Sequence, residues 1–594
     1  MTGQSPRLRR AGPYLLAGLC LLIFLAFLIW PMLLTISGGF QSTGADGSVT
    51  WTLAHVAAVF EDPVLREGLV NSLQIGVLVT LLSLLIALPL AVVATSFEFR
   101  GKAILSALLL VPLILPPFVG AIGLRQLLGR FGSVNSLLID MGWVDAAHPI
   151  DFLGGGLLGV VIAEALHLYP IIYLNATAAL ANLDPALEQA AENLGASRWT
   201  RFRRVTLPLI LPGLFAGGII VFIWSFTELG TPLMFDYYTV TPVQVFWGIQ
   251  EMADSPRPYA LVAVMLLTAV MLYTLGKLVF GGRAYAMATR AASAAVGRRL
   301  DGGRGLLAAA PFALITFLAV LPHIGVVLAS VTEPGSWYFS ALPTDYTSVH
   351  YLGALTHPLA SGSIRNSLVY STAAMLLDIG LGLLIAWLVV RSRVVGRQLL
   401  DGLAMLPLAV PGLVLAFGYV AMTLHWPFPQ LAAFFGEQGW DGLASMMQVT
   451  GESPDPILFL VIAYAIRRLP YVVRSAVAGL QQTSGELEEA AVNLGASPWY
   501  SIRRVVIPLI MANLIAGGLL AFSFAMLEVS DSLILAQTEE HYPITKAIYT
   551  LFDRLGDGPY IASAMGVWGM ALLTLTLVGA SLMLGKKLGA IFRI

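Results

Sequence analysis

Long apolar segments recur along the whole chain and alternate with short polar segments. Most of the apolar segments have twenty or more residues, the length that an α-helix needs to cross the hydrocarbon core of a bilayer. The pattern therefore predicts an all-α integral membrane protein with about twelve transmembrane helices. The expected helices cover residues 13–36, 68–96, 103–127, 154–178, 207–229, 257–279, 306–330, 366–390, 400–424, 456–480, 507–530 and 559–583.

The composition agrees with a membrane protein. Hydrophobic residues make up 57% of the chain and charged residues 11%, about half the charged share of a soluble domain. The single cysteine, Cys20, excludes an intramolecular disulfide and a thiolate cluster for zinc or iron–sulfur. The histidines are scattered, so the sequence indicates no confident metal site. The apolar run from Pro13 to Ile36 is too long for the core of a signal peptide and is expected to be an uncleaved anchor.

The distribution of charge predicts the orientation in the membrane. If the N-terminus is cytoplasmic, most Lys and Arg residues lie in cytoplasmic segments and the opposite loops are acidic. Such a bias sets the orientation of membrane proteins during insertion. We therefore expect a multi-pass protein of the bacterial cytoplasmic (inner) membrane with both termini in the cytoplasm. The basic segments include 100–102, 198–204, 277–304, 391–397 and 586–593.

One segment of the chain occurs twice, 300 residues apart. EQAAENLGASRW at 188–199 returns as EEAAVNLGASPW at 488–499, and 19 of the 31 positions from 188 to 218 are identical at this offset. Further pairs recur at an offset of 295: PLILPPFVGAIG with PLAVPGLVLAFG, and Asn71-Ser72-Leu73 with Asn366-Ser367-Leu368.

These offsets predict a tandem duplication of a six-helix unit. The two units have parallel orientation because six is even, and a pathway is expected between them. The difference between the offsets places about five extra residues in the outer loop between 425 and 455. The expected domains are a first transmembrane unit at 1–280, a cytoplasmic linker at 281–305 and a second transmembrane unit at 306–594.

Each copy of the repeated segment is predicted to be a short cytoplasmic helix. Asp184-Pro185 and Ser484 are typical helix starts, and Gly195 is a typical helix end. Leu187 and Leu194 form part of an apolar stripe. Two nearly identical helices presented to the cytoplasm indicate two docking sites for two copies of one partner.

The repeated segment resembles the EAA loop of binding-protein-dependent ABC importer permeases, in which Glu-Ala-Ala is followed by Gly and then by Leu-Pro. The first copy has Gln189 where the family has Glu, and the second has Ile507 in place of Leu. The two docking contacts are therefore expected to be unequal. The resemblance assigns ATPase coupling to Glu188, Gln189, Ala190, Ala191 and Gly195, and to Glu488, Glu489, Ala490, Ala491 and Gly495.

The resemblance also implies partners. The sequence contains no Walker A pattern, so we expect a permease that is not itself an enzyme. Two ABC ATPase subunits, which bind ATP and Mg, would dock on the cytoplasmic side, and a solute-binding protein would dock outside. No cofactor is expected in this chain, and its other partner is the lipid bilayer, not a nucleic acid.

Among these permeases, the chain resembles the fused ferric-iron permeases most closely. The similarity lies in RRLPYVVRSAVAGLQQ at 467–482, the LEEAAVNLGAS segment that follows, and Leu527-Glu528. Ferric iron is therefore the expected cargo. Similar fused permeases serve thiamine, and related ones serve aminoethylphosphonate or polyamines. A secondary transporter is the alternative from another class, but it would not need paired docking helices.

Charged residues at membrane depth are the candidates for the translocation path. Glu228 and Glu528 occupy equivalent positions and are expected late in helices five and eleven, as a pair near the outer end of the path. Glu164 and His167 share one face of helix four. Three interpretations remain open. The carboxylates line a path for a cation, Arg467 and Arg468 hold an anion, or Glu and Arg pair to fix the packing.

Two other features of the membrane segments are predicted. Asp378 lies within helix eight. Proline residues are expected to kink helices three, four, nine and ten, which is tolerable where neighbouring groups satisfy the freed carbonyls. The kinks are expected at Pro116-Pro117, Pro170, Pro411 and Pro470.

Overall fold

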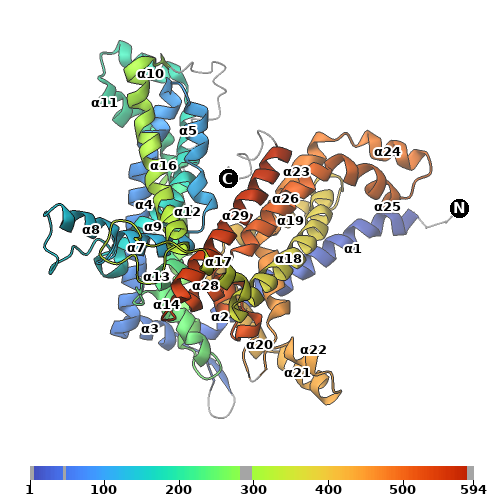
Figure 1. Cartoon of the computed structure of the whole chain (residues 1–594). Coiled ribbons are helices and arrows are strands. Elements are labelled where there is room, and N and C mark those ends of the chain that lie inside the picture. Colours follow the sequence, from blue (N-terminus) through green and yellow to red (C-terminus); the bar gives the residue numbers. More distant parts are fainter. Residues whose placement is uncertain (1–5, 44–47, 281–297, 452, 585–594) are drawn as a thin grey trace.

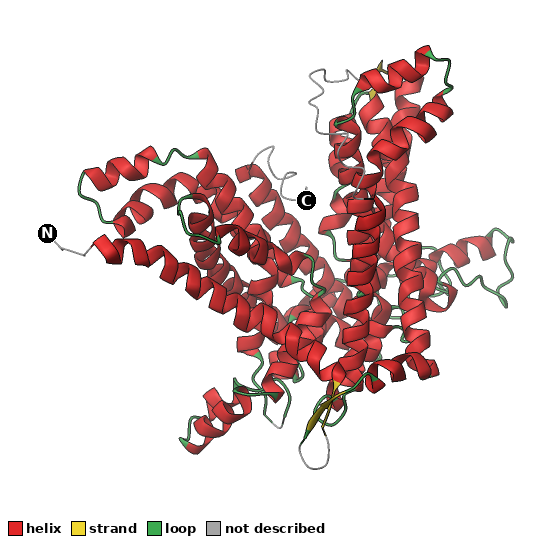
Figure 2. Cartoon of the chain, turned by 180° about the vertical axis from the view of Figure 1, so that it is seen from behind, coloured by secondary structure: helices red, strands yellow, loops and turns green. Residues whose placement is uncertain are grey.

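The computed structural model describes residues 6–43, 48–280, 298–451 and 453–584, and this part of the chain is almost entirely helical (Figure 2). The strands are confined to two small pairs. β1 (Gln41–Thr43) and β2 (Val49–Trp51) are antiparallel, and β3 (Phe97–Glu98) and β4 (Arg298–Arg299) are parallel. The all-α prediction is confirmed.

The described residues account for all twelve expected membrane helices. Within the described ranges, nine helices are long and apolar enough to cross a membrane, and two further candidates are bent pairs. The remaining expected helix is α23 (Ile457–Gln482). It contains Arg467, Arg468 and Arg474 and is therefore less apolar than the others.

The first unit contains the following helices in chain order: α1 (Pro6–Phe24), η1 (Leu25–Ile29), α2 (Trp30–Phe40), α3 (Ala54–Glu61), α4 (Pro63–Ser96), α5 (Lys102–Leu108), α6 (Val111–Ile114), α7 (Pro117–Leu128), α8 (Ser133–Asp140), η2 (Gly154–Gly156), α9 (Leu157–Ala181), α10 (Pro185–Asn193), α11 (Arg198–Arg201), η3 (Phe202–Thr206), α12 (Leu207–Phe226), α13 (Gly230–Met234), α14 (Thr241–Gly248), η4 (Ile249–Glu251) and α15 (Arg257–Phe280).

The second unit repeats this order with a longer outer segment at α21 and α22. Besides α23, its helices are α16 (Gly302–Ser330), α17 (Val349–Thr356), α18 (Pro358–Val390), α19 (Arg397–Met405), η6 (Leu406–Leu408), α20 (Gly412–Leu424), α21 (Phe428–Glu437), α22 (Asp441–Ser445), α24 (Glu486–Asn493), α25 (Pro498–Ser501), η7 (Ile502–Val506), α26 (Ile507–Met526), α27 (Ser530–Leu535), η8 (Glu539–His541), α28 (Ile544–Phe552) and α29 (Gly558–Leu584).

Proline breaks one membrane segment in each unit. The segment 102–140 bends by 96° between Ile114 and Pro117, and the segment 397–424 bends by 102° before Gly412. These are the kinks predicted at Pro116-Pro117 and Pro411. By contrast, α9 and α23 continue as single helices through Pro170 and Pro470. Both bends lie next to the cavity described below.

The first membrane helix of each unit packs on the other unit. α1 and α2 contact α18, α19 and α20, whereas α16 contacts α5, α6 and α7. Repeat-related glycines permit these contacts. A Cβ at Gly123 would lie 1.8 Å from the Pro322 carbonyl oxygen, and one at Gly418 would lie 2.8 Å from the Pro31 carbonyl oxygen. The glycine that ends both the 112–123 and the 407–418 segment therefore allows a helix of the other unit to pack closely against it.

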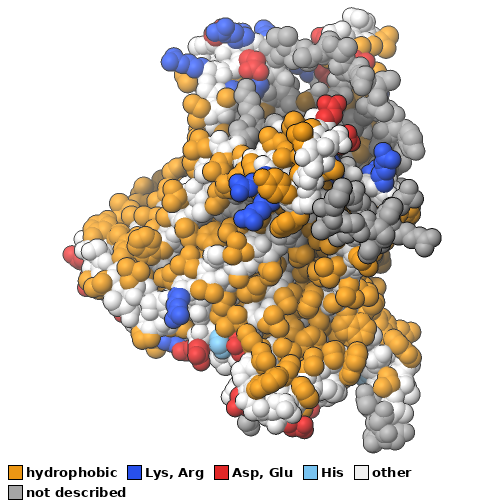
Figure 3. Space-filling view, turned by 90° about the vertical axis from the view of Figure 1, so that its right-hand side faces the viewer, with side chains coloured by type: hydrophobic (Ala, Val, Ile, Leu, Met, Phe, Trp, Pro, Cys, Tyr) orange, Lys and Arg blue, Asp and Glu red, His pale blue; other side chains and the backbone are white. Residues whose placement is uncertain are grey.

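The two units diverge like the arms of a V (Figure 1). α10 and α11 lie at the end of one arm, and α24 and α25 lie at the end of the other. The helices α3, α14 and α20–α22 lie at the opposite end of the molecule, and hydrophobic side chains cover the surface between (Figure 3). Most of the predicted linker 281–305 lies outside the described residues, as do the basic residues 586–593; α16 already begins at Gly302.

Candidate functional site

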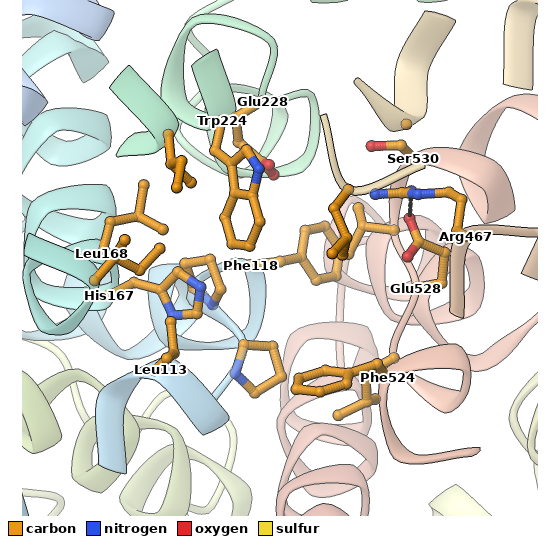
Figure 4. Close-up of a pocket in the computed structure, with 18 of the residues that line it drawn as sticks. Leu113, Phe118, His167, Leu168, Trp224, Glu228, Arg467, Phe524, Glu528 and Ser530 are labelled. Carbon is orange, nitrogen blue, oxygen red and sulfur yellow. Dashed lines mark hydrogen bonds and ion pairs between the residues drawn. The ribbon is translucent and has the colours of Figure 1, made fainter. Parts of the chain in front are cut away.

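A cavity of about 290 Å³ lies between the two units (Figure 4). Its wall in the first unit comes from α6, α7, α9 and α12, and its wall in the second comes from η6, α23, α26 and the turn before α27. All six of the path candidates chosen from the sequence line it. They are Glu164, His167, Glu228, Arg467, Arg468 and Glu528.

The wall of the first unit carries two carboxylates without an ion-pair partner in the described chain. The Thr231 hydroxyl donates to Glu164 at 2.6 Å, and the backbone amide of Gly230 donates to Glu228 at 3.1 Å. His167 Nδ1 lies 2.7 Å from the Pro112 carbonyl oxygen, which anchors the imidazole ring to the bent segment. This wall therefore presents two carboxyl groups whose hydrogen-bond donors are neutral.

The position of the two repeat-related glutamates differs from the sequence prediction. α12 ends at Phe226 and α26 ends at Met526, so Glu228 and Glu528 lie in the turns that follow these helices, not late within them. The reason is local for Glu228, because its carboxylate accepts from the first amides of α13 and caps that helix.

The wall of the second unit holds a compact cluster of opposite charges. Both Arg467 and Arg468 of α23 donate hydrogen bonds to the Glu528 carboxylate. Arg467 also lies 3.3 Å from Asp531, which is completely buried. Asp531 was not among the residues predicted from the sequence to line the path. The available signal was its spacing, because it follows Glu528 by three residues and so lies on the same side of a helical turn.

The two carboxylates do not form the predicted pair. Glu228 bonds to amides of the first unit and Glu528 bonds to arginines of the second, and Figure 4 shows them on opposite walls. The repeat explains the difference in charge. Position 167 is His in the first unit and 467 is Arg in the second, and Leu168 corresponds to Arg468. Only the second unit supplies cations to its glutamate.

A further exchange of residues relates the two walls. In the first unit Glu164 of α9 bonds to Thr231 of α13, while in the second Tyr464 of α23 bonds to Ser532 of α27 at 2.6 Å. The second unit thus has no acid at the position in α23 that corresponds to Glu164 of α9. It carries a buried acid in α27 instead, at Asp531. Asp378 in α18 is buried too, and neither of its carboxylate oxygens has a hydrogen-bond partner in the described structure.

The cavity does not contain a ready set of metal ligands. Within the described ranges, no group of three or more His, Cys, Asp or Glu side chains is arranged to hold a metal ion. The arrangement can instead offer a passing cation carboxylate oxygens on one wall. Because both arginines are already bonded to Glu528, they are less suited to hold an anion.

The repeated segments form matching helices at the ends of the two arms. Asp184 caps α10 by accepting from the amide of Ala186 at 2.9 Å, and α24 begins after Gly485. Both helices end at a glycine with positive φ, +80° at Gly195 and +93° at Gly495. The helix end predicted at Gly195 is therefore present, and it has its counterpart in the second unit.

These helices expose the same apolar side chains in both units. Leu194 is 88% exposed and Leu494 is 90% exposed, and Trp199 and Trp499 are each 68% exposed. No residue of α10 or α24 is buried. Gln189, Ala190, Glu489 and Ala490 lie on these exposed helices, while Ala191 is half-buried, as is Ala491. Large apolar groups at matching exposed sites are typical of an interaction surface.

The two helices are anchored differently. Thr206 donates to Glu188 at 2.5 Å, whereas Arg391 at the end of α18 forms an ion pair of 2.8 Å with Glu488. Arg391 also donates to the carbonyl oxygen of Thr483 at 2.7 Å. The sequence predicted unequal docking contacts from Gln189 and Ile507. The structure adds a difference in how the two helices are anchored.

The recurring Asn-Ser pair has a role at the other end of the molecule. Ser72 accepts from the first amide of α14 at 2.9 Å, and Ser367 accepts from the first amide of α28 at 2.7 Å. The neighbouring Asn71 and Asn366 side chains donate to carbonyl oxygens of the segments that precede these helices. Each unit thus uses α4 or α18 to hold one short outer helix.

Comparison with known proteins gives one family twice. Residues 82–288 and 378–582 each match the model described as "Binding-protein-dependent transport system inner membrane component". A putative ferric transport system permease protein of Haemophilus influenzae is 26% identical over 90% of this chain and 80% of its own length. A ferric transport system permease protein of Actinobacillus pleuropneumoniae is 27% identical over 93% of this chain and 75% of its own length.

A solved structure also gives a match. A bacterial ABC transporter involved in the import of the acidic polysaccharide alginate has a chain with 19% sequence identity and a TM-score of 0.35, covering 48% of this chain and 98% of that one. The paired family matches confirm that the chain contains two copies of one unit.

Proposed function

The chain belongs to the family of binding-protein-dependent transport system inner membrane components, and on this premise we propose that it carries ferric iron across the membrane as the permease of an ATP-driven importer. It contains two fused permease units and is a multi-pass protein of the inner membrane. In the proposed arrangement, both termini and the arm ends with α10 and α24 are cytoplasmic. The proposed units are 1–280 and 306–594, joined by 281–305.

The observation that carries the proposal is the pair of matching helices at the arm ends, with a charged cavity between the arms. Each helix would dock one ATPase subunit through its exposed leucine and its neighbouring alanines. Closing of the two ATPases on ATP would then bring the arms together and change access to the cavity. The ATPases would bind ATP and Mg, and a solute-binding protein would deliver the cargo at the opposite end.

The chemistry of the cavity supports a cation as cargo. Glu164 and Glu228 line it and form no ion pair within the described chain, while Arg467 and Arg468 are bonded to Glu528. An incoming cation would be attracted to the first wall and would not displace a resident arginine. The names of the two relatives that match over most of the chain point in the same direction.

Docking is tested by changing Leu194 and Leu494 to Glu. Both side chains are exposed, so folding should be unaffected, while ATPase binding should fall at least about tenfold because a charge would be buried without a partner. Leu555→Glu is the matched control, since Leu555 is equally exposed in the loop before α29. Native mass measurement should give one copy of this chain with two ATPases. Unchanged ATPase binding by the double variant would disprove the docking assignment.

Cargo is tested in proteoliposomes that contain the complete complex with its binding protein. Radioactive ferric iron should accumulate in an ATP-dependent manner, and excess thiamine, aminoethylphosphonate or spermidine should not compete. Competition by one of these compounds, with no uptake of iron, would assign the transporter to that cargo. Uptake driven by an ion gradient without ATPase subunits would indicate a secondary transporter instead.

A further inference from the structure

A lysine is buried at the end of the molecule opposite the coupling helices. Lys546 in α28 is 7% exposed. Its Nζ donates to the carbonyl oxygen of Leu533 at 2.8 Å and lies 4.9 Å from the centre of the Phe246 ring and 5.5 Å from that of Tyr542. No acidic side chain of the described chain forms an ion pair with it. The ammonium group is therefore satisfied by a carbonyl and by aromatic rings.

These contacts join the two units. Phe246 belongs to α14 of the first unit, whereas Leu533 and Tyr542 belong to the second. An ammonium group over an aromatic face is attracted by the ring quadrupole, and more strongly when both are removed from water. Lys546 is thus a charged contact across the boundary between α14 and α28.

Two other contacts join the first unit to the second. The side-chain amide of Gln250 donates to that of Gln537 at 3.2 Å, and the Arg125 guanidinium lies 5.2 Å from the centre of the Phe552 ring. Next to Lys546, the hydroxyl of Thr545 donates at 2.6 Å to the carbonyl oxygen of Glu528 in the cavity wall. The boundary is therefore connected directly to the cavity.

The repeat supplies a natural comparison for Lys546. Ser72 accepts a hydrogen bond from the amide of Thr241, the first residue of α14. Ser367 accepts one from the amide of Ile544, the first residue of α28. Two residues further on, the first unit has Val243 and the second has Lys546. Val243 is fully buried. Packing at this position therefore requires only an apolar side chain, and the ammonium group must serve another purpose.

We propose that Lys546 is the latch of the outer gate, holding α14 and α28 together so that the cavity is closed on the side away from the coupling helices. The gate opens outward only when the contact of the ammonium group with Phe246 is broken. The latch rests on the proposed transport function, but it does not depend on which cargo is carried.

The latch is tested by cross-linking across the gate in the complete complex. Gln250 and Gln537 are changed to Cys, and Cys20 to Ser, and a short bifunctional thiol reagent is added without nucleotide or binding protein. With Lys546 present, the two cysteines should cross-link efficiently. Lys546→Val should lower the rate roughly tenfold, as expected from the loss of a desolvated cation–π contact. ATP hydrolysis without the binding protein should rise in the same variant.

Matched variants separate the latch from general instability. Lys546→Arg should retain cross-linking, because the guanidinium can still lie over Phe246, whereas Lys546→Met should behave like Val although it retains the length of the side chain. Arg554→Gln is the control, since Arg554 is a partly exposed cation paired with Glu539 nearby. Equal cross-linking of the Val, Met and parent proteins would overturn the latch. If neither the parent nor any variant takes up iron, but cross-linking changes as expected, only the assignment of ferric iron as the cargo is contradicted.

Discussion

Arg467 of α23 donates a hydrogen bond to Glu528 in the turn between α26 and α27, and both side chains are largely buried. The contact ties the central helix of the second unit to the segment that leads into the outer gate. No equivalent ion pair exists in the described part of the first unit, where His167 replaces the arginine and bonds to a backbone carbonyl. The two walls of the cavity therefore differ in how their charges are paired although they derive from one repeated unit.

The difference predicts opposite phenotypes for the same substitution at equivalent positions. Glu528→Gln removes the charge that neutralises two buried arginines and should destabilise the protein by about 3–5 kcal/mol. Glu228→Gln should leave the melting temperature nearly unchanged, because an amide oxygen can still cap α13, but should reduce uptake of a cation. Thermal unfolding in detergent and uptake in proteoliposomes measure the two effects.

A second substitution checks the cause of the instability. Arg468→Leu introduces the residue that the first unit has at position 168. It should restore part of the stability of Glu528→Gln, since one unpaired cation is removed with the acid. Absence of any rescue would show that Glu528 acts through something other than its arginine partners. Full uptake by Glu228→Gln would exclude that carboxylate from the path.

Alanine at Gly123 should disrupt the contact between the two units. The added Cβ would lie 1.8 Å from a backbone oxygen of Pro322, so α16 would have to move. We expect a loss of stability of about 1–3 kcal/mol from overpacking, and more if the helix cannot shift. Gly380→Ala is the control, because a Cβ on this helical glycine meets no atom within 4 Å. Equal melting temperatures for the two variants would contradict the close approach.

The serine caps predict local effects on the outer helices. Ser367→Ala removes the acceptor of the first amide of α28, and Ser72→Ala does the same for α14. Loss of such a cap costs about 0.5–2 kcal/mol of helix stability. Hydrogen–deuterium exchange should therefore rise in residues 544–552 for the first variant and in 241–248 for the second. Exchange that rises in both helices for either variant would indicate that the caps do not act locally.

The anchors of the coupling helices should contribute unequally to coupling. Arg391→Gln removes the ion pair with Glu488 and leaves that partly buried carboxylate without its cation. Thr206→Val removes only a hydroxyl that donates to Glu188 in the first unit. We expect Arg391→Gln to lower the cargo transported per ATP more than Thr206→Val does, because a charged partner is lost. Equal ratios in the two variants would show that the anchors are equivalent.

The sequence by itself determined the class of protein, the duplication and the positions of the repeated helices α10 and α24. Apolar segments of membrane length are decisive because a helix satisfies its own backbone groups in lipid. The offset of 300 residues identified α10 and α24 as equivalents, and the caps of α10 at Asp184 and Gly195 follow from local backbone chemistry. The kinks at Pro116-Pro117 and Pro411 could also be predicted, because proline breaks a helix locally, and two short segments meet at a steep angle at each site.

Only the tertiary structure decided how the charged residues are paired. Sequence periodicity places Glu164 and His167 on one face, but it does not show which element faces them across a cavity. The partners of Glu528 lie 60 and 61 residues away along the chain, and Lys546 meets Phe246 of the other unit. Such pairings depend on how helices pack after insertion. A repeat predicts the same scaffold twice, whereas single substitutions such as Leu168 against Arg468 give the two copies different chemistry.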